Sequence, residues 1–176
     1  MRPLLADPAI QMALHAGLAL LFARAAWHKL RGLGRFGAAL NGYRMLPAAG
    51  VPVAAASIAA AEAAVAVGLA LPATGSAAAL AGAGLLLCYA SAMAVAWLRG
   101  QREIDCGCGP PDVRRRIGPE LIARNGVLAG LCIAATLAPG ARELLWIDHL
   151  SIVAALLAAA ALYAFSEYPA VRRQVA

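Results

Sequence analysis

Long apolar runs, separated by short segments that hold most of the charge, are the feature that most limits how this chain can fold. Of its 176 residues, 62% are hydrophobic and only 14% are charged, whereas a soluble domain usually carries about 25% charged residues. A helix needs about 20 predominantly apolar residues to cross a bilayer, so the chain has room for a few such helices and little else. It is therefore predicted to be an all-α, polytopic membrane helix bundle.

Proline and turn residues mark where the apolar runs begin and end. Pro52 suits the start of a helix, and the segment 71–76 reads as a tight turn between two spans. The predicted spans are about 8–27, 51–71, 76–98, 120–138 and 146–165. Alanine is only mildly apolar and dominates the weaker runs, so four spans is the alternative to five. Residues 1–176 are predicted to form a single transmembrane domain.

The basic residues indicate an orientation in the membrane. The formal net charge is +6, but no basic segment is interleaved with aromatic residues as in proteins that stack nucleic-acid bases, so nucleic acid is not an expected partner. With five spans, nearly every Lys and Arg falls within 24–44, 99–124 and the tail 167–176, which share one side of the membrane. The positive-inside rule predicts that this side is cytoplasmic.

The polar loop 99–119 carries the pair Cys106-Gly107-Cys108. Two cysteines separated by one residue can bridge only in a small, strained ring, and strained disulfides are easily reduced. Arg102 and the arginines at 114–116 supply positive potential, which favours the reactive thiolate form. Cys106 and Cys108 are therefore predicted to be the catalytic residues of thiol–disulfide exchange.

Two other interpretations of the same pair stay open. The cysteines would be an inert clasp if nothing exchanges with them. Two thiolates can also hold Cu(I), or Zn²⁺ if Asp105 or another chain completes the ligand set. Two sulfurs alone are too few ligands for a complete zinc site, so no metal site is predicted.

Several polar or reactive side chains fall inside the predicted spans. At about 1.5 Å per residue from the basic side, His15, Glu62, Cys88 and Cys132 all lie roughly 15 to 20 Å deep. An ionisable residue at that depth is expensive and needs a partner, and the prediction pairs Glu62 with His15. Cys88 and Cys132 would form a second dithiol if they face each other, and are ordinary buried residues if they do not. Lys29 is expected to extend to the headgroups or to lie beneath the cysteine loop.

The sequence resembles a known family of membrane proteins. The most specific feature is Asp105-Cys106-Gly107-Cys108-Gly109, followed by Arg124-Asn125 at the start of the fourth span. Further matching residues are Lys29, Phe36, Leu40, Tyr43, Leu46, Pro47 and Glu62. Together they resemble the methylamine utilisation protein MauE family, within the wider group of MauE- and DoxX-like redox-associated membrane proteins. Pro110-Pro111 stand where that family often has an aromatic residue, so the shape of the loop is expected to differ.

The resemblance implies a multi-pass protein of the bacterial inner (cytoplasmic) membrane. It implies a role in maturation of the methylamine dehydrogenase small subunit, by disulfide formation, processing or transport, beside a thioredoxin-like periplasmic protein. The residues expected to support Cys106 and Cys108 are Lys29, Glu62, His15, Cys88, Cys132, Arg124 and Asn125. The alternatives are a non-enzymatic assembly or metal-handling factor, and a DoxX-like redox subunit with quinone, the one cofactor considered, at the midplane of the bundle.

The family role and the charge pattern give different sides for the loop. A periplasmic partner needs the cysteines outside, whereas the basic residues predict the cytoplasmic face. Transfer of reducing equivalents across the membrane would reconcile them, as would an inverted topology or a loop that dips inward.

Overall fold

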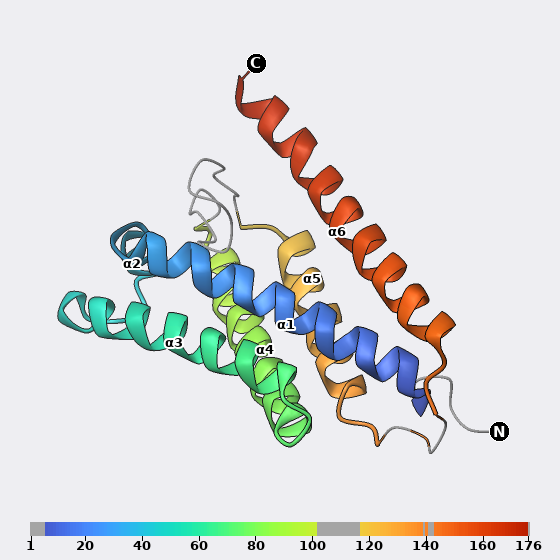
Figure 1. Cartoon of the computed structure of the whole chain (residues 1–176). Helices are drawn as coiled ribbons and strands as arrows, with labels where there is room; N and C mark the ends of the chain where they lie inside the picture. The colour runs from blue at the N-terminus through green and yellow to red at the C-terminus, as the bar shows by residue number, and fades with distance from the viewer. Residues whose placement is uncertain (1–5, 102–116, 139, 141–142, 176) are drawn as a thin grey trace.

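The computed structural model describes residues 6–101, 117–138, 140 and 143–175, and these form helices joined by short turns (Figure 1). The elements are α1 (Pro8–Arg31), α2 (Leu33–Gly42), the 3-10 helix η2 (Ala48–Gly50), α3 (Val51–Ala70), α4 (Gly75–Leu98), α5 (Pro119–Ala134) and α6 (Trp146–Val175). The described residues contain no β-strand, and the all-α prediction is confirmed. Cys106 and Cys108 lie outside the described residues.

The ends of α1 follow from its flanking residues. The Asp7 side chain caps the first turn by accepting a hydrogen bond from the backbone N–H of Ala9, at 2.9 Å, and Pro8 occupies the first turn, where its missing N–H costs nothing. At the other end, the N–H of Gly32 bonds to the carbonyl of Lys29. The helix runs four residues past the predicted end of the first span. Lys and Arg end the apolar run, but both residues favour helix, so the helix continues.

A tight turn joins α3 to α4 and holds them close together. The hydroxyl of Thr74 donates to the carbonyl of Gly68 at 2.9 Å. A Cβ at Gly68 would lie only 2.7 Å from the Cβ of Ala78, so glycine is what permits this approach. The predicted hairpin of the second and third spans is the pair α3 and α4.

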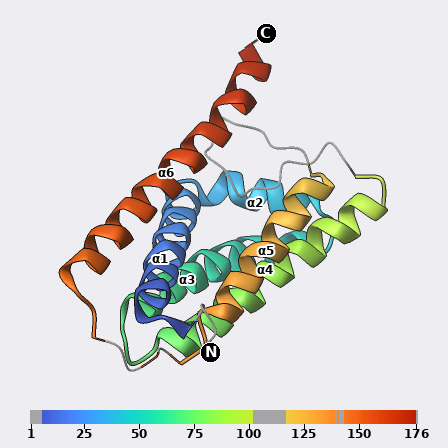
Figure 2. The same ribbon diagram turned by 90° about the vertical axis from the view of Figure 1, so that its right-hand side faces the viewer.

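The helices pack in the spatial order α6, α1, α3, α4, α5 (Figures 1 and 2). Helix α1 contacts α3 along its length, and α4 pairs with α5. Figure 2 shows α6 on the outer side of α1, away from the α4–α5 pair. The C-terminal end of α5 is joined to α1 by the Gln11 side-chain amide, which donates to the carbonyl of Ala134 at 2.9 Å.

In the part of the chain that the structure describes, three helical segments are long and apolar enough to cross a membrane: Pro8–Arg31, Ala48–Ala70 and Gly75–Leu98. They coincide with the first three predicted spans. Helix α5 has 16 residues, and the apolar part of α6 found among the described residues is Trp146–Ala158. The count of five spans therefore stays a prediction. Residues 167–175, predicted as a tail, continue α6, because Glu, Arg and Gln are good helix formers.

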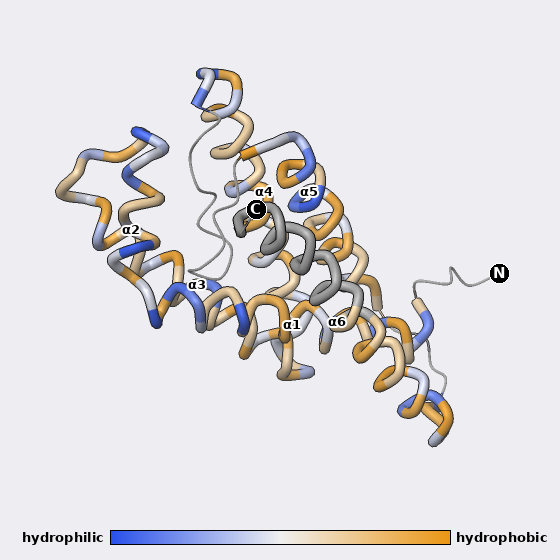
Figure 3. The backbone as a smooth tube through the Cα atoms, turned by 90° about the horizontal axis from the view of Figure 1, so that it is seen from above, coloured by the Kyte–Doolittle hydropathy of each residue, from blue (hydrophilic) through white to orange (hydrophobic). Residues whose placement is uncertain are grey.

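The distribution of polarity is the reverse of that in a soluble protein. Figure 3 shows hydrophobic and weakly polar residues along most of the helices, with hydrophilic residues concentrated near α2 and the helix ends. Large apolar side chains are exposed on the outside, among them Leu20, Val53, Val67, Leu80 and Val127. Among the residues whose side chains the structure describes, the buried polar or charged ones are Gln11, Lys29, Glu62 and Asn125. A surface of this kind suits contact with lipid, which solvates apolar side chains and leaves charges to face the bundle interior.

Helix α2 was not among the predicted elements. Glycine at positions 32, 34, 37 and 42 and the lack of a long apolar run hide it in the sequence. It packs against α3, where Gly37 lies beside Val51, whose side chain is 3.6 Å from where a Cβ of residue 37 would be. Because α2 extends the chain beyond the end of α1, α3 starts farther out and its middle comes level with the end of α1.

Candidate functional site

A buried ion pair joins the end of α1 to the middle of α3. Nζ of Lys29 lies 2.6 Å from Oε1 of Glu62, and the two side chains are only 4% and 2% exposed. The hydroxyl of Tyr89, on α4, donates to the same oxygen at 2.8 Å. One carboxylate oxygen therefore ties three helices together. Bonds of this kind to a charged acceptor are stronger than those between neutral groups.

Aromatic rings complete the surroundings of the ammonium group. Nζ of Lys29 lies 5.1 Å from the centre of the Phe36 ring and 5.3 Å from that of Tyr89. Both distances are within the range of a cation–π attraction. Phe36 belongs to α2, so the helix missed in the sequence helps to hold the lysine.

The structure corrects the predicted partner of Glu62. His15 is hydrogen-bonded through Nδ1 to the carbonyl of Gln11 at 2.9 Å, and its ring packs on Gly75, where a Cβ would lie 2.9 Å from Nε2. It is thus at the start of α4, whereas Glu62 binds Tyr89 farther along that helix. Counting depth along each span ignored the offset that α2 introduces. Lys29 lies inside the bundle and not at the headgroups, while its expected position beneath the cysteine loop concerns residues outside the described ones and stays a prediction.

A cavity of about 510 Å³ opens beside the ion pair. Its polar lining consists of Arg24, His28, Lys29, Glu62, Tyr89, Arg124 and Asn125, and its apolar lining includes Leu20, Leu21, Leu86, Leu128, Leu156 and Ala160. These residues come from α1, α3, α4, α5 and α6. Cavities of roughly 300–1,000 Å³ with a mostly apolar lining and a few polar groups are typical of small-molecule sites.

Four of the predicted supporting residues meet at this cavity: Lys29, Glu62, Arg124 and Asn125. Asn125 is buried and its amide donates to the carbonyl of Leu121 at 2.8 Å, which turns it along its own helix. Tyr89 and His28 were not predicted. Tyr89 could have been found from the sequence, because it is a phenol within an apolar run and a buried Tyr hydroxyl needs a hydrogen-bond partner.

Two buried atoms at the cavity have no hydrogen-bond partner among the described residues: Oε2 of Glu62 and Nε of Arg124. The first is an acceptor when the carboxyl is ionised, and the second is a donor. Both atoms belong to side chains that line the cavity, and leaving such atoms unpaired is costly. The cavity thus presents complementary hydrogen-bonding atoms in apolar surroundings.

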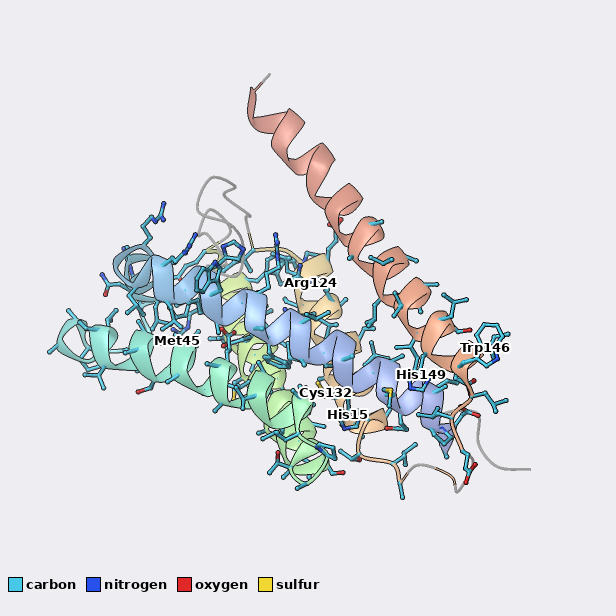
Figure 4. All side chains as sticks on the ribbon, in the orientation of Figure 1. His15, Met45, Arg124, Cys132, Trp146 and His149 are labelled. Atoms are coloured by element: carbon cyan, nitrogen blue, oxygen red, sulfur yellow. The ribbon has the colours of Figure 1, made fainter. Side chains whose placement is uncertain are left out.

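Cys88 and Cys132, considered above either as a second dithiol or as ordinary residues, form no disulfide in the structure. Cys88 is exposed and Cys132 is buried, and both are free thiols. Cys132 lies in the main apolar cluster with Leu86 and Ala83. In Figure 4, Cys132 and His15 lie toward one end of the bundle and Arg124 toward the other. Arg124 lines the cavity, whereas His15 and Cys132 do not.

The flanks of the cysteine loop are anchored at the end of the bundle where α1 ends. Helix α4 finishes at Leu98, and Gly100 turns the chain with φ of 78°, a conformation that suits glycine. On the other flank, Ile117 is buried against Tyr43, Met93 and Ala96. Both ends of the segment holding Cys106 and Cys108 are therefore fixed near the polar end of the cavity.

Apolar helices that expose hydrophobic side chains and bury charged ones define a multi-pass integral membrane protein. The chain belongs to the methylamine utilisation protein MauE family, whose family model matches residues 7–138. The resemblance drawn from the sequence is confirmed. The match covers α1 to α5, and α6 lies beyond it.

Individual relatives extend over most of the chain. It is 43% identical to the methylamine utilization protein MauE of Paracoccus versutus over 143 residues, which is 81% of this chain and 77% of the relative. The MauE protein of Paracoccus denitrificans is 41% identical over 76% of this chain and 72% of its own length. That of Methylophilus methylotrophus is 32% identical over 91% and 82%. No solved structure matches the chain.

Proposed function

We propose that this protein acts in methylamine utilisation as a thiol–disulfide exchange factor of the bacterial cytoplasmic membrane, needed for maturation of the methylamine dehydrogenase small subunit. The observation that carries the proposal is the match to the methylamine utilisation protein MauE family over residues 7–138, a range that includes the Cys106-Gly107-Cys108 pair. The family match supports the pathway, and the chemistry of the pair supports the reaction.

The exchange needs no other group than the two cysteines and a partner disulfide. The thiolate of one cysteine attacks a sulfur of the partner disulfide and forms a mixed disulfide, releasing the partner's other sulfur as a thiolate. The second cysteine of the pair then attacks the mixed disulfide. The pair ends oxidised and the partner reduced, and the reverse sequence oxidises the partner. The expected partners are a thioredoxin-like periplasmic protein and the small-subunit precursor.

The folded bundle supports this chemistry by fixing the residues that flank the loop. Ile117 is buried at one flank, and the end of α4 fixes the other. Arg102 and the arginines at 114–116 lie on the same segment as the cysteines and favour the thiolate. A partner at the membrane surface would meet an electropositive segment whose flanking residues are fixed.

The test is to trap the partner. Cys106→Ser and Cys108→Ser are each made in the full chain, and mixed disulfides are sought by mass spectrometry after acid quenching. We expect one of the two variants to hold a covalent partner, since the resolving cysteine is then missing. Cys88→Ser is the matched control, because Cys88 is exposed on α4, outside the loop. Normal small-subunit maturation in the Cys106→Ser/Cys108→Ser variant would reject exchange and favour a non-enzymatic assembly or metal-handling factor.

A further inference from the structure

The cavity beside Glu62 changes from apolar to polar along its length. On α1 it is lined first by Gly17, Leu20 and Leu21, and then by Arg24, His28 and Lys29. A Cβ at Gly17 would lie 3.5 Å from the side chain of Leu156, so α6 closes the apolar end. An occupant must therefore have a hydrocarbon part and a polar head.

The apolar end of the cavity reaches the outer surface of the bundle. Leu20, which lines it, is 62% exposed, and Leu157, next to the lining residue Leu156, is 66% exposed. This surface faces lipid if α1 spans the membrane, as its length and composition allow. A ligand dissolved in the bilayer can enter here without crossing water.

The polar end selects the head group. Oε2 of Glu62 and Nε of Arg124 are unpaired among the described residues, and Lys29 neutralises the Glu62 charge. The phosphodiester of a membrane phospholipid has no hydroxyl to donate to Glu62. A quinone ring has two oxygens, which are carbonyl acceptors in the oxidised form and hydroxyl donors in the reduced form. Nε of Arg124 can donate to a ring oxygen of either form, whereas Oε2 of Glu62 can accept a hydrogen bond only from a hydroxyl of the reduced form.

We propose that this cavity binds the head of a lipid-soluble quinone, with Arg124 donating to a ring oxygen in either redox form and Glu62 accepting from a hydroxyl of the quinol. The role of this quinone site, which is to accept electrons from the cysteine pair, rests on the proposed function. Oxidation of the two thiols of Cys106 and Cys108 to one disulfide releases two electrons and two protons, and reduction of one quinone to quinol consumes the same number. The polar end of the cavity lies near the anchored flanks of the cysteine loop.

The test measures binding directly. The full chain is placed in phosphatidylcholine nanodiscs and titrated with radiolabelled decylubiquinone, and saturable binding at one site is expected. Leu128→Trp, which fills the cavity from α5, should abolish it. Val127→Trp is the matched control, because Val127 is the next residue and 66% exposed, and it should bind as the native chain does.

Arg124→Gln provides a second variant that does not depend on a bulky substitution. It removes a donor to the ligand and should weaken binding by about tenfold or more. If Leu128→Trp fails to fold, as judged by size-exclusion chromatography, Arg124→Gln decides the question. The proposal is overturned if the native chain shows no saturable binding, or if the folded variants bind as tightly as the native chain.

Two further arms separate the alternatives. If phosphatidylglycerol in the nanodisc displaces decylubiquinone and co-purifies with the native chain but not with Leu128→Trp, the cavity is a phospholipid site and the proposal is wrong. The Cys106→Ser/Cys108→Ser variant should bind decylubiquinone as the native chain does. Retained binding with normal small-subunit maturation in that variant rejects the proposed function alone, whereas failed binding with a trapped partner rejects the quinone site alone.

Discussion

Lys29 and Glu62, on different helices, share a hydrogen-bonded contact of 2.6 Å inside the bundle. Each would be expensive to bury alone in a membrane, and each is the other's counter-ion. The pair is therefore the most informative point at which to test the fold.

A double-mutant cycle tests this pair. Lys29→Met and Glu62→Gln should each lower the free energy of unfolding by about 3–5 kcal/mol, because each leaves an uncompensated or unpaired group in the interior. The double variant Lys29→Met/Glu62→Gln should be substantially more stable than the sum of the two losses implies. Thermal unfolding in detergent, followed by size-exclusion chromatography, measures all three. Additive losses would show that the two residues do not depend on each other.

The close approach of α3 and α4 can be tested at a glycine. Gly68→Ala should lower stability by about 1–3 kcal/mol, because the new methyl group meets the Cβ of Ala78, which cannot move without its helix. Gly84→Ala, on α4 with nothing within 4 Å of its Cβ position, is the control and should be neutral or slightly stabilising. The same thermal assay compares them. Equal effects at both positions would argue against the packing of this hairpin.

Labelling from each side of the membrane tests the topology. In a Cys88→Ser background, Arg35→Cys on α2 and native Cys106 should react with a membrane-impermeant maleimide added from one side. Ala73→Cys, in the α3–α4 turn, should react from the other. The basic residues predict that the first side is cytoplasmic. Periplasmic labelling of Cys106 would instead allow direct exchange with the thioredoxin-like protein and would make the charge rule wrong here.

The two cysteines within the helices should be dispensable. Cys88→Ser and Cys132→Ala, singly and together, are expected to leave small-subunit maturation unchanged, since the structure shows both as free thiols, one exposed and one buried. Cys132→Ala removes a fully buried sulfur and should reduce stability modestly. The readout is the amount of mature small subunit, compared with the Cys106→Ser/Cys108→Ser variant. Loss of maturation in the Cys88→Ser variant would support transfer of reducing equivalents across the membrane through Cys88 and Cys132.

The sequence predicted those parts of the fold that depend on local composition. The runs 51–71 and 76–98 correspond closely to α3 and α4, because a long apolar run bounded by proline or a polar turn has few alternatives to a membrane helix. It did not predict α2, whose glycine content and short length give no such signal. That one omission shifted the expected level of Glu62 relative to α1.

The candidate site was predicted as a set of residues but not as an arrangement. Lys29, Glu62, Arg124 and Asn125 were all named, yet the partner of Glu62 was not found. A lysine near the end of a span usually extends to the headgroups, and only the offset of α3 shows that it turns inward. Tertiary packing, which no local pattern encodes, decided between these two positions.

The order of Lys29 and Glu62 along the chain bears on how the protein enters the membrane. Helix α1 is synthesised before α3, so the ammonium must wait for its counter-ion. Its place near the end of α1 lets it remain among headgroups during that interval at little cost. Glu62, in the middle of α3, is too far from the helix ends to reach the headgroups, but it emerges from the ribosome when Lys29 is already available. Glu62 therefore need not enter the lipid without its counter-ion. In a chain that joined these helices in the opposite order, Glu62 would be inserted before Lys29 was available.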